Sequence, residues 1–247
     1  MKLTIVGCGD AFGSGGRSNT CFRLDSNGRT IVVDFGASAL VAWSRLGLDT
    51  NDIDAITLSH LHGDHFGGLP FLLLQAQFVA ERRKPLTISG PPGLKARLAA
   101  LCEAMFPGMM RNAWRFPLTL VEITPGSAQL IGGFEVRTIE VVHPSGAPAT
   151  GVRISNGKKI FAYSGDTQWT EALTDVARDA EFLMIECYAA QPGVPHHIDW
   201  MTLSQNLPRL MAKRIVLTHL GEGALAIRAA MEQAGLEIAA DGKTYDI

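Results

Sequence analysis

Four side chains able to bind metal lie within six residues of one another near position 60. The segment SHLHGDHFGG, residues 59–68, contains His60, His62, Asp64 and His65. Neutral imidazole and carboxylate groups suit Zn²⁺, and also Mn²⁺ or Fe²⁺. The whole chain has only seven histidines, so three of them within six residues are hard to attribute to chance. The segment therefore predicts a metal site built on a tight loop.

Further ligands are expected where later apolar strands end, because one cluster cannot complete two metal sites. His143 ends a predicted strand at 134–142, Asp166 follows one at 158–163, and His219 ends one at 214–218. Such strand-to-loop edges are where active sites are usually built. A single His or Asp at a strand end is often only a cap. Three of them downstream of the histidine cluster favour metal ligation.

The elements that must position these side chains run from β-rich to α-containing in each half of the chain. Asn-Gly turns at 27–28 and 156–157 predict two hairpins. In the first half we expect strands at 3–6, 20–24, 30–34, 55–58, 86–89 and 118–123, and helices at 37–46, 71–82 and 94–105. In the second half we expect strands at 134–142, 150–154, 158–163, 182–186, 214–218 and 244–247, and helices at 169–177, 201–211 and 224–234. Such halves predict an α/β fold, a four-layer α/β/β/α sandwich formed as a single domain over residues 1–247.

The motif HLHGDH, followed by a strand-end His, an SGDT-type Asp and a final LTH, resembles the metallo-β-lactamase superfamily over almost the whole chain. The resemblance implies the metallo-β-lactamase fold and two divalent metal ions, Zn²⁺ or alternatively Mn²⁺. It also implies a division of the ligands. One ion would be held by His60, His62 and His143, and the other by Asp64, His65 and His219, with Asp166 bridging the two.

Within the superfamily, the sequence is most similar to the ribonuclease Z and phosphodiesterase branch. The segments GCGDA at 7–11 and GRSNTC at 16–21 resemble the opening loop of that branch. The resemblance implies a proton-shuttling Glu–His pair, for which Glu186 and His197 are the candidates and His196 is a rival. Ribonuclease Z usually carries a long tRNA-binding arm between the ligands that correspond to His143 and Asp166. Here only 22 residues separate the two, which argues against precursor tRNA as the substrate.

The chemistry follows from two adjacent cations. Two divalent ions about 3.5–4 Å apart can share a bridging hydroxide whose pKa falls toward about 7, which supplies a nucleophile at neutral pH. Asp64 can bind metal and orient that hydroxide, and His197, oriented by Glu186, can protonate a leaving alkoxide. We therefore expect a phosphodiesterase that acts on a small or cyclic phosphate ester. Backbone amides of residues 8–17 are candidates for contacts with the substrate.

Several alternatives stay open from the sequence. A ribonuclease Z-like tRNA 3′ endonuclease, an arylsulfatase, a lactonase or a β-lactamase would use the same scaffold. Di-iron redox relatives replace the second histidine of the cluster with glutamate, so His62 at that position favours hydrolysis. The irregular segment 106–116 could be a lid, a pocket wall or a dimer contact. The sequence does not determine whether the chain forms a homodimer.

Composition argues against several other classes of protein. The 247 residues are 47% hydrophobic and 19% charged, a balance typical of globular chains. The net charge of −2 and the scattered basic residues argue against a nucleic-acid partner. No apolar stretch reaches the roughly 18 residues that a membrane span needs. Four widely spaced cysteines and the lack of a signal-peptide pattern predict a reduced, cytoplasmic protein.

Overall fold

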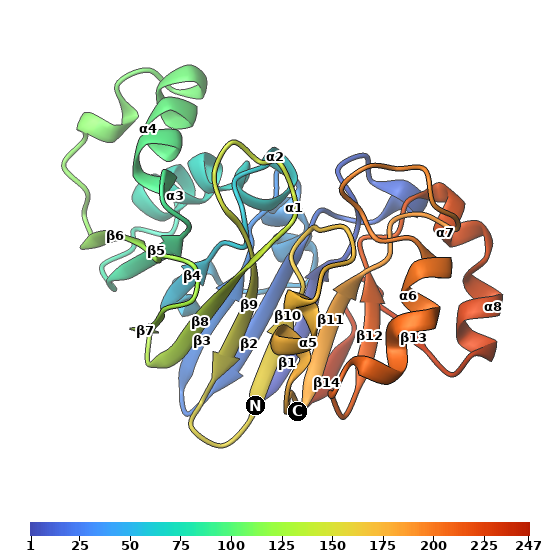
Figure 1. The fold of residues 1–247 in the computed structure, drawn as a ribbon. Coiled ribbons are helices and arrows are strands. Elements are labelled where there is room, and N and C mark those ends of the chain that lie inside the picture. The colour runs from blue at the N-terminus through green and yellow to red at the C-terminus, as the bar shows by residue number, and fades with distance from the viewer.

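Fourteen strands form two seven-stranded sheets that pack face to face, with helices on both outer sides (Figure 1). The structure is a computed structural model that describes residues 1–247. The predicted α/β/β/α layering is confirmed. None of the helices combines the length and the apolarity that crossing a bilayer requires.

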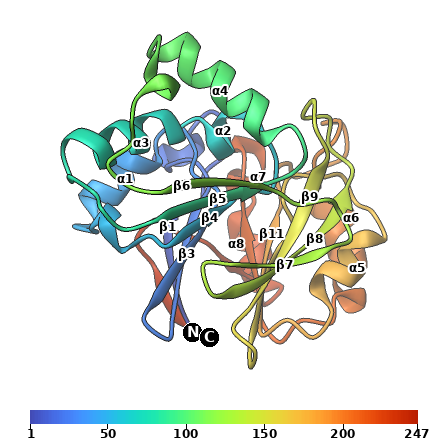
Figure 2. The same ribbon diagram turned by 90° about the vertical axis from the view of Figure 1, so that its left-hand side faces the viewer.

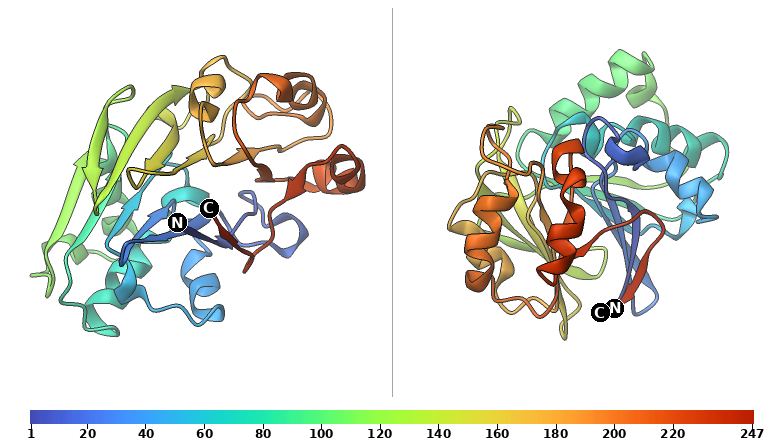
Figure 3. Two further views of the ribbon diagram at one scale, coloured as in Figure 1. Left: turned by 90° about the horizontal axis from the view of Figure 1, so that it is seen from below. Right: turned by 90° about the vertical axis from the view of Figure 1, so that its right-hand side faces the viewer.

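The first sheet comes mostly from the N-terminal half and has the strand order β14-β1-β2-β3-β4-β5-β6. Its strands are β1 Lys2–Gly7, β2 Cys21–Ser26, β3 Arg29–Val33, β4 Ala55–Thr57, β5 Leu86–Gly90, β6 Leu118–Glu122 and β14 Thr244–Asp246. Its outer face is covered by four helices (Figure 2): α1 Ala39–Arg45, α2 Gly63–Phe66, α3 Leu69–Phe78 and α4 Leu94–Met105. Because β14 pairs with β1, the two ends of the chain lie side by side (Figure 3).

The second sheet has the order β13-β12-β11-β10-β9-β8-β7. Its strands are β7 Ala128–Ile131, β8 Phe134–Val141, β9 Ala149–Ser155, β10 Ile160–Tyr163, β11 Phe182–Glu186, β12 Ile215–Thr218 and β13 Glu237–Ile238. Its outer face packs against α5 Ala172–Ala177, α6 Trp200–Asn206, α7 Glu222–Ala226 and α8 Arg228–Gln233.

Three apolar layers hold the sandwich together. Successive side chains of a strand point to opposite faces of the sheet, so neighbouring residues of one strand belong to different layers. In β10, Phe161 and Tyr163 point into the layer between the sheets, while Ala162 points outward to the layer under α5. The middle layer contains 22 buried residues drawn from both sheets. It is therefore the layer that fixes one sheet against the other.

The predicted elements differ from the observed ones mainly at helix ends. The helix expected at 201–211 stops at Asn206 and continues only as a 3₁₀ turn, Leu207–Arg209, because Pro208 cannot continue an α-helical ladder. The helix expected at 224–234 is two short helices separated at Ile227, whose backbone is not helical. Strands β7 and β13 were not predicted. Three of the four residues of β7 are exposed, and β13 has only two residues.

The connections bring several strand ends to one edge of the molecule. Strands β3 to β6 run parallel in the first sheet, and β10 to β13 run parallel in the second. In open α/β sheets the carboxyl ends of parallel strands are where ligands bind. The loop that leads to α2 lies at the upper edge in Figure 1, and the two chain ends lie at the opposite edge.

The middle layer should dominate stability. Phe161 is fully buried there, with its ring edge-to-face against Phe22 at a centroid distance of 6.3 Å. Truncation in F161A should lower the free energy of unfolding by about 3–5 kcal/mol, because it leaves a cavity between the sheets. In the control variant F78A, a 60% exposed ring on α3 is removed, and the change should stay within about 0.5 kcal/mol. Urea denaturation of both variants measures this, and similar losses in the two would contradict the layering.

Candidate metal centre

The HLHGDH motif forms the turn between β4 and the short helix α2. His60 and His62 precede the helix, and Asp64 and His65 lie within it. The turn packs closely against the segment that follows β3. A Cβ atom on Gly36 would lie 2.1 Å from the carbonyl oxygen of Asp64, so only glycine fits at this contact. The close approach fixes the position of α2, and with it two of the predicted ligands.

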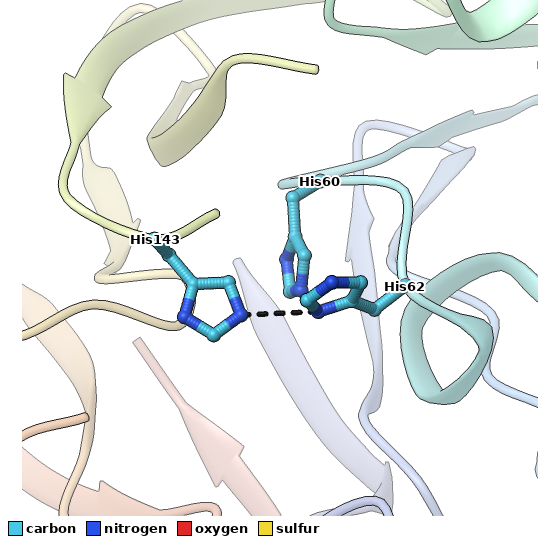
Figure 4. Close-up of side chains that lie close together, drawn as sticks. All are labelled: His60, His62 and His143. Atoms are coloured by element: carbon cyan, nitrogen blue, oxygen red, sulfur yellow. Dashed lines mark hydrogen bonds between the residues drawn. The ribbon is translucent and has the colours of Figure 1, made fainter. Parts of the chain in front are cut away.

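One predicted ligand group consists of three imidazoles, His60, His62 and His143 (Figure 4). His143 comes from the loop after β8, in the second sheet. Its Nε2 atom lies 3.0 Å from Nδ1 of His62, and candidate ligand atoms of all three rings lie within 4.8 Å of one another. Side chains that follow strands of both sheets thus lie together in this group.

The other group consists of Asp64, His65, Asp166 and His219. Asp166 follows β10, and His219 follows β12. The Oδ2 atom of Asp166 lies 3.2 Å from Nε2 of His65 and 3.3 Å from Nε2 of His219. The same oxygen lies 3.8 Å from Nε2 of His60, in the first group. Asp166 therefore stands between the two groups, where a bridging ligand is expected.

The donor set fits divalent cations. The Nε2 atom of His60 is buried without a hydrogen-bond partner, and such an atom costs about 1–3 kcal/mol when it stays unsatisfied. Burial lowers the pKa of His60 well below its usual value, which keeps that imidazole in the neutral form that binds metal. Burial opposes charge on His65 too, but Asp166, Asp64 and Asp34 outweigh it and raise the pKa of His65. The same negative charge would attract a metal cation.

A buried carboxylate that the sequence did not point to orients predicted ligands of both groups. Asp34 follows β3 with a positive φ of 57°, and its side chain is fully buried. It accepts hydrogen bonds from the backbone N–H and the hydroxyl of Ser59, both at 2.7 Å, and pairs with Nδ1 of His65 at 2.7 Å. Because the Ser59 hydroxyl donates to Asp34, its oxygen can accept from Nδ1 of His60, 3.0 Å away. Both rings are thereby held with Nε2 free for a metal.

Glu186 and His197 form the pair that was expected beside the ligands. Nδ1 of His197 lies 3.1 Å from Oε2 of Glu186, which is fully buried and also accepts from the backbone N–H of Thr167. Burial raises the pKa of the Glu186 carboxyl to about 7. Burial alone would lower the pKa of His197, but its hydrogen bond to Glu186, together with the negative charges of Glu186, Asp166 and Asp64, outweighs burial and raises that pKa. The pair therefore retains a proton near neutral pH.

The geometry distinguishes His197 from its neighbour His196. The ring of His197 stacks on His219 at a centroid distance of 5.7 Å and lies 4.9 Å from the ring of His143. His196 is exposed, has a φ of 64°, and contributes its backbone oxygen, 3.0 Å from Nδ1 of His143. The geometry thus favours His197 for the shuttle role, which stays a prediction.

Sequence comparison assigns the chain to a family. The profile of the anti-Pycsar protein Apyc1 family matches residues 1–245. The chain belongs to that family. The anti-Pycsar protein Apyc1 of Bacillus phage 010DV004 is 26% identical to this Apyc1-family chain, over 99% of the chain and 98% of the phage protein.

Solved structures share the fold of this Apyc1-family protein. The metallo-β-lactamase fold protein YhfI of Bacillus subtilis has a TM-score of 0.78 at 21% identity, with 99% of each chain covered. Human tRNase Z, short form, has a TM-score of 0.79 at 22% identity, with 100% of this chain and 99% of the human chain covered. The protein is a metal-dependent hydrolase of the metallo-β-lactamase superfamily, from its ribonuclease Z and phosphodiesterase-like branch.

The missing arm is confirmed in this Apyc1-family protein. Between His143 and Asp166 the chain forms only a short loop and the two strands β9 and β10. A pocket of about 380 Å³ opens over the predicted ligands instead. It is lined by Ala11, Phe12, His62, Asp64, His143, Asp166, Tyr188, Val194, Pro195, His197 and His219. The pocket therefore contains most of the predicted ligands, together with His197.

Replacement of Asp34 tests its role in orienting the ligands. D34N removes the charge that orients His65 and Ser59, so the affinity for Zn²⁺ should fall about 10- to 100-fold. The matched control is D54N, because Asp54 is also a buried carboxylate but pairs with Lys84 and Arg29 away from the pocket. Competition titration against a chromophoric chelator measures the affinities. A D34N protein that binds Zn²⁺ as tightly as D54N would show that Asp34 has no such role.

Proposed function

We propose that this protein is a dinuclear phosphodiesterase that opens cyclic phosphate diesters, with cyclic nucleotides as its substrate class. The observation that carries the proposal is one carboxylate, Asp166, within reach of two ligand groups, next to a Glu186–His197 pair. The name of the family, anti-Pycsar, supports cyclic-nucleotide degradation.

The ligand groups divide the metal-binding work. His60, His62 and His143 would hold one ion, Asp64, His65 and His219 the other, and Asp166 would contact both. The donor set suits Zn²⁺, with Mn²⁺ as the alternative. Two such ions supply an activated water nucleophile and neutralise the charge that develops on the phosphoryl oxygens.

The remaining steps belong to side chains of this chain. Asp64 lines the pocket with 11% of its side chain exposed, so its carboxylate can accept a hydrogen bond from the attacking water and orient it. Ring opening of a cyclic diester expels an alkoxide, which needs a proton. His197 faces the pocket with Nδ1 held by Glu186, so its Nε2–H is the donor available for that oxygen.

The proton-donor role predicts an effect that depends on the leaving group. H197A should lower kcat for 3′,5′-cyclic AMP about 10²- to 10⁴-fold, because the ribose alkoxide leaves without a proton donor. Hydrolysis of bis(p-nitrophenyl) phosphate should fall by less than about tenfold, since p-nitrophenolate needs no proton. Steady-state kinetics with both substrates measure the difference.

The control for this experiment is H196N, because asparagine tolerates the positive φ at that position. H196N should keep both activities, since only the backbone oxygen of His196 contacts the site. Equal losses on both substrates in H197A would instead assign His197 to metal or substrate binding.

Metal removal tests the nuclearity. Chelation should abolish hydrolysis and lower the Tm by roughly 5 °C or more, since bound ions stabilise only the folded state. Added Zn²⁺ or Mn²⁺ should restore both activity and Tm. The reconstituted protein should then contain two metal ions per chain, as measured by atomic emission spectrometry. Full activity with a single equivalent would contradict the dinuclear proposal.

A tRNA 3′ endonuclease is the second candidate, favoured by the similarity to human tRNase Z. The absent arm and the net charge of −2 weigh against it. Incubation of the metal-loaded protein with a precursor tRNA that carries a 3′ trailer distinguishes the two candidates. The same preparation, assayed on an aryl sulfate, a lactone and a β-lactam, covers the remaining hydrolase alternatives. Oxygen consumption together with a high iron content would point to the di-iron alternative.

A further inference from the structure

One aromatic side chain at the metal pocket stands out by its exposure. Phe12 is 82% exposed, more than any other large hydrophobic side chain of the protein, and it lines the pocket that contains the ligands. Single exposed apolar residues are ordinary on protein surfaces and by themselves indicate nothing. Phe78 on α3 is such a residue, 60% exposed and not part of the pocket. The position of Phe12 is therefore what calls for an explanation.

Hydrogen bonds to a buried carboxylate stabilise the loop that carries Phe12. Asp10 is fully buried and accepts hydrogen bonds from the backbone N–H of Phe12 at 3.3 Å and of Ser14 at 2.9 Å. The hydroxyl of Ser14 donates to the same carboxylate at 2.8 Å. The side-chain amide of Asn19 in turn donates to the backbone oxygen of Asp10 at 2.9 Å. These bonds hold the backbone in a conformation that leaves the Phe12 ring in solvent, and an apolar ring gains nothing from that place in the free protein.

The pocket changes character from its floor to its rim. On the floor, Asp166 and His219 are almost fully buried and polar. At the rim lie Phe12, Val194, which is 40% exposed, and the exposed Pro195. A ligand that fits this gradient is anionic at one end and has a flat apolar surface at the other. The pocket volume of about 380 Å³ lies within the range of small-molecule sites.

We infer that Phe12 is the stacking platform for the base of a cyclic nucleotide whose phosphate lies over the metal ligands. The inference rests on the proposed function. Every nucleobase has a π face, and an aromatic side chain stacks on it without reading its edges. Val194 and Pro195 supply the other apolar contacts at the rim. Phe12 is thus a specificity-determining residue that favours nucleotides over phosphate diesters without a base.

The test compares two substrates with the same phosphodiester. One is 3′,5′-cyclic AMP, and the other is the abasic 1-O-methyl ribose 3′,5′-cyclic phosphate. Wild-type protein should prefer the nucleotide in kcat/KM, and F12A should lose about tenfold or more of that preference, mainly through a higher KM. F12W keeps an aromatic face and should retain the preference. F12L keeps only apolarity and should lose most of it. F78A, which removes the exposed ring on α3, should leave the ratio unchanged.

The outcomes separate this inference from the proposed function. A wild-type protein that hydrolyses neither substrate contradicts the phosphodiesterase proposal itself. Hydrolysis of both substrates with equal kcat/KM, or an F12A protein with an unchanged ratio, refutes the role of Phe12 and leaves the phosphodiesterase intact. An F12L protein that matches F12W would reduce the contact to simple apolar burial and would also overturn stacking.

Discussion

The site depends on negative charge buried where the two sheets meet. Asp34, Asp64 and Asp166 gather there, with side chains 0%, 11% and 2% exposed, and their ion-pair partners are histidines. Burying an ionised carboxylate costs several kcal/mol unless an opposite charge and hydrogen bonds compensate. The raised pKa of His65 favours its protonated form, but one imidazolium does not balance three carboxylates. A divalent cation is the partner that this arrangement of donors fits.

This constraint links the chemistry to the packing of the fold. The HLHGDH turn belongs to the first sheet, whereas His143, Asp166 and His219 follow strands of the second. Neither predicted ligand group is complete until the middle apolar layer has brought the sheets together. Metal affinity and folding stability should therefore rise and fall together, as binding linkage requires. The contact between Gly36 and Asp64 serves the same assembly of the two groups, because a displaced α2 would move two of the predicted ligands.

The sequence predicted the layered fold, and it singled out the side chains that the structure brings close together, because both leave strong local signals. A potential metal ligand directly after an apolar strand is easy to recognise in a sequence, and His143, Asp166 and His219 each follow such a strand. Asp34 escaped prediction, since an aspartate after a strand looks like an ordinary cap until the position of His65 is known. The choice between His196 and His197 also needed the structure, because it rests on the position of the His197 ring beside His143 and His219 and on the exposure of His196. Helix ends near Pro208 and Ile227 were missed, since apolar spacing carries through both breaks.

The two ligand groups differ in chemical character. One consists of three imidazoles, and the other contains the carboxylates of Asp64 and Asp166 besides its two imidazoles. Imidazole nitrogen suits zinc well, whereas carboxylate oxygen suits harder ions such as manganese. In the proposed dinuclear site the two positions are therefore inequivalent. Stepwise loading would then place a different metal in each position and yield a mixed-metal enzyme. Paramagnetic Mn²⁺ would occupy the position next to Asp64 and Asp166, where its spectrum is a probe of that position.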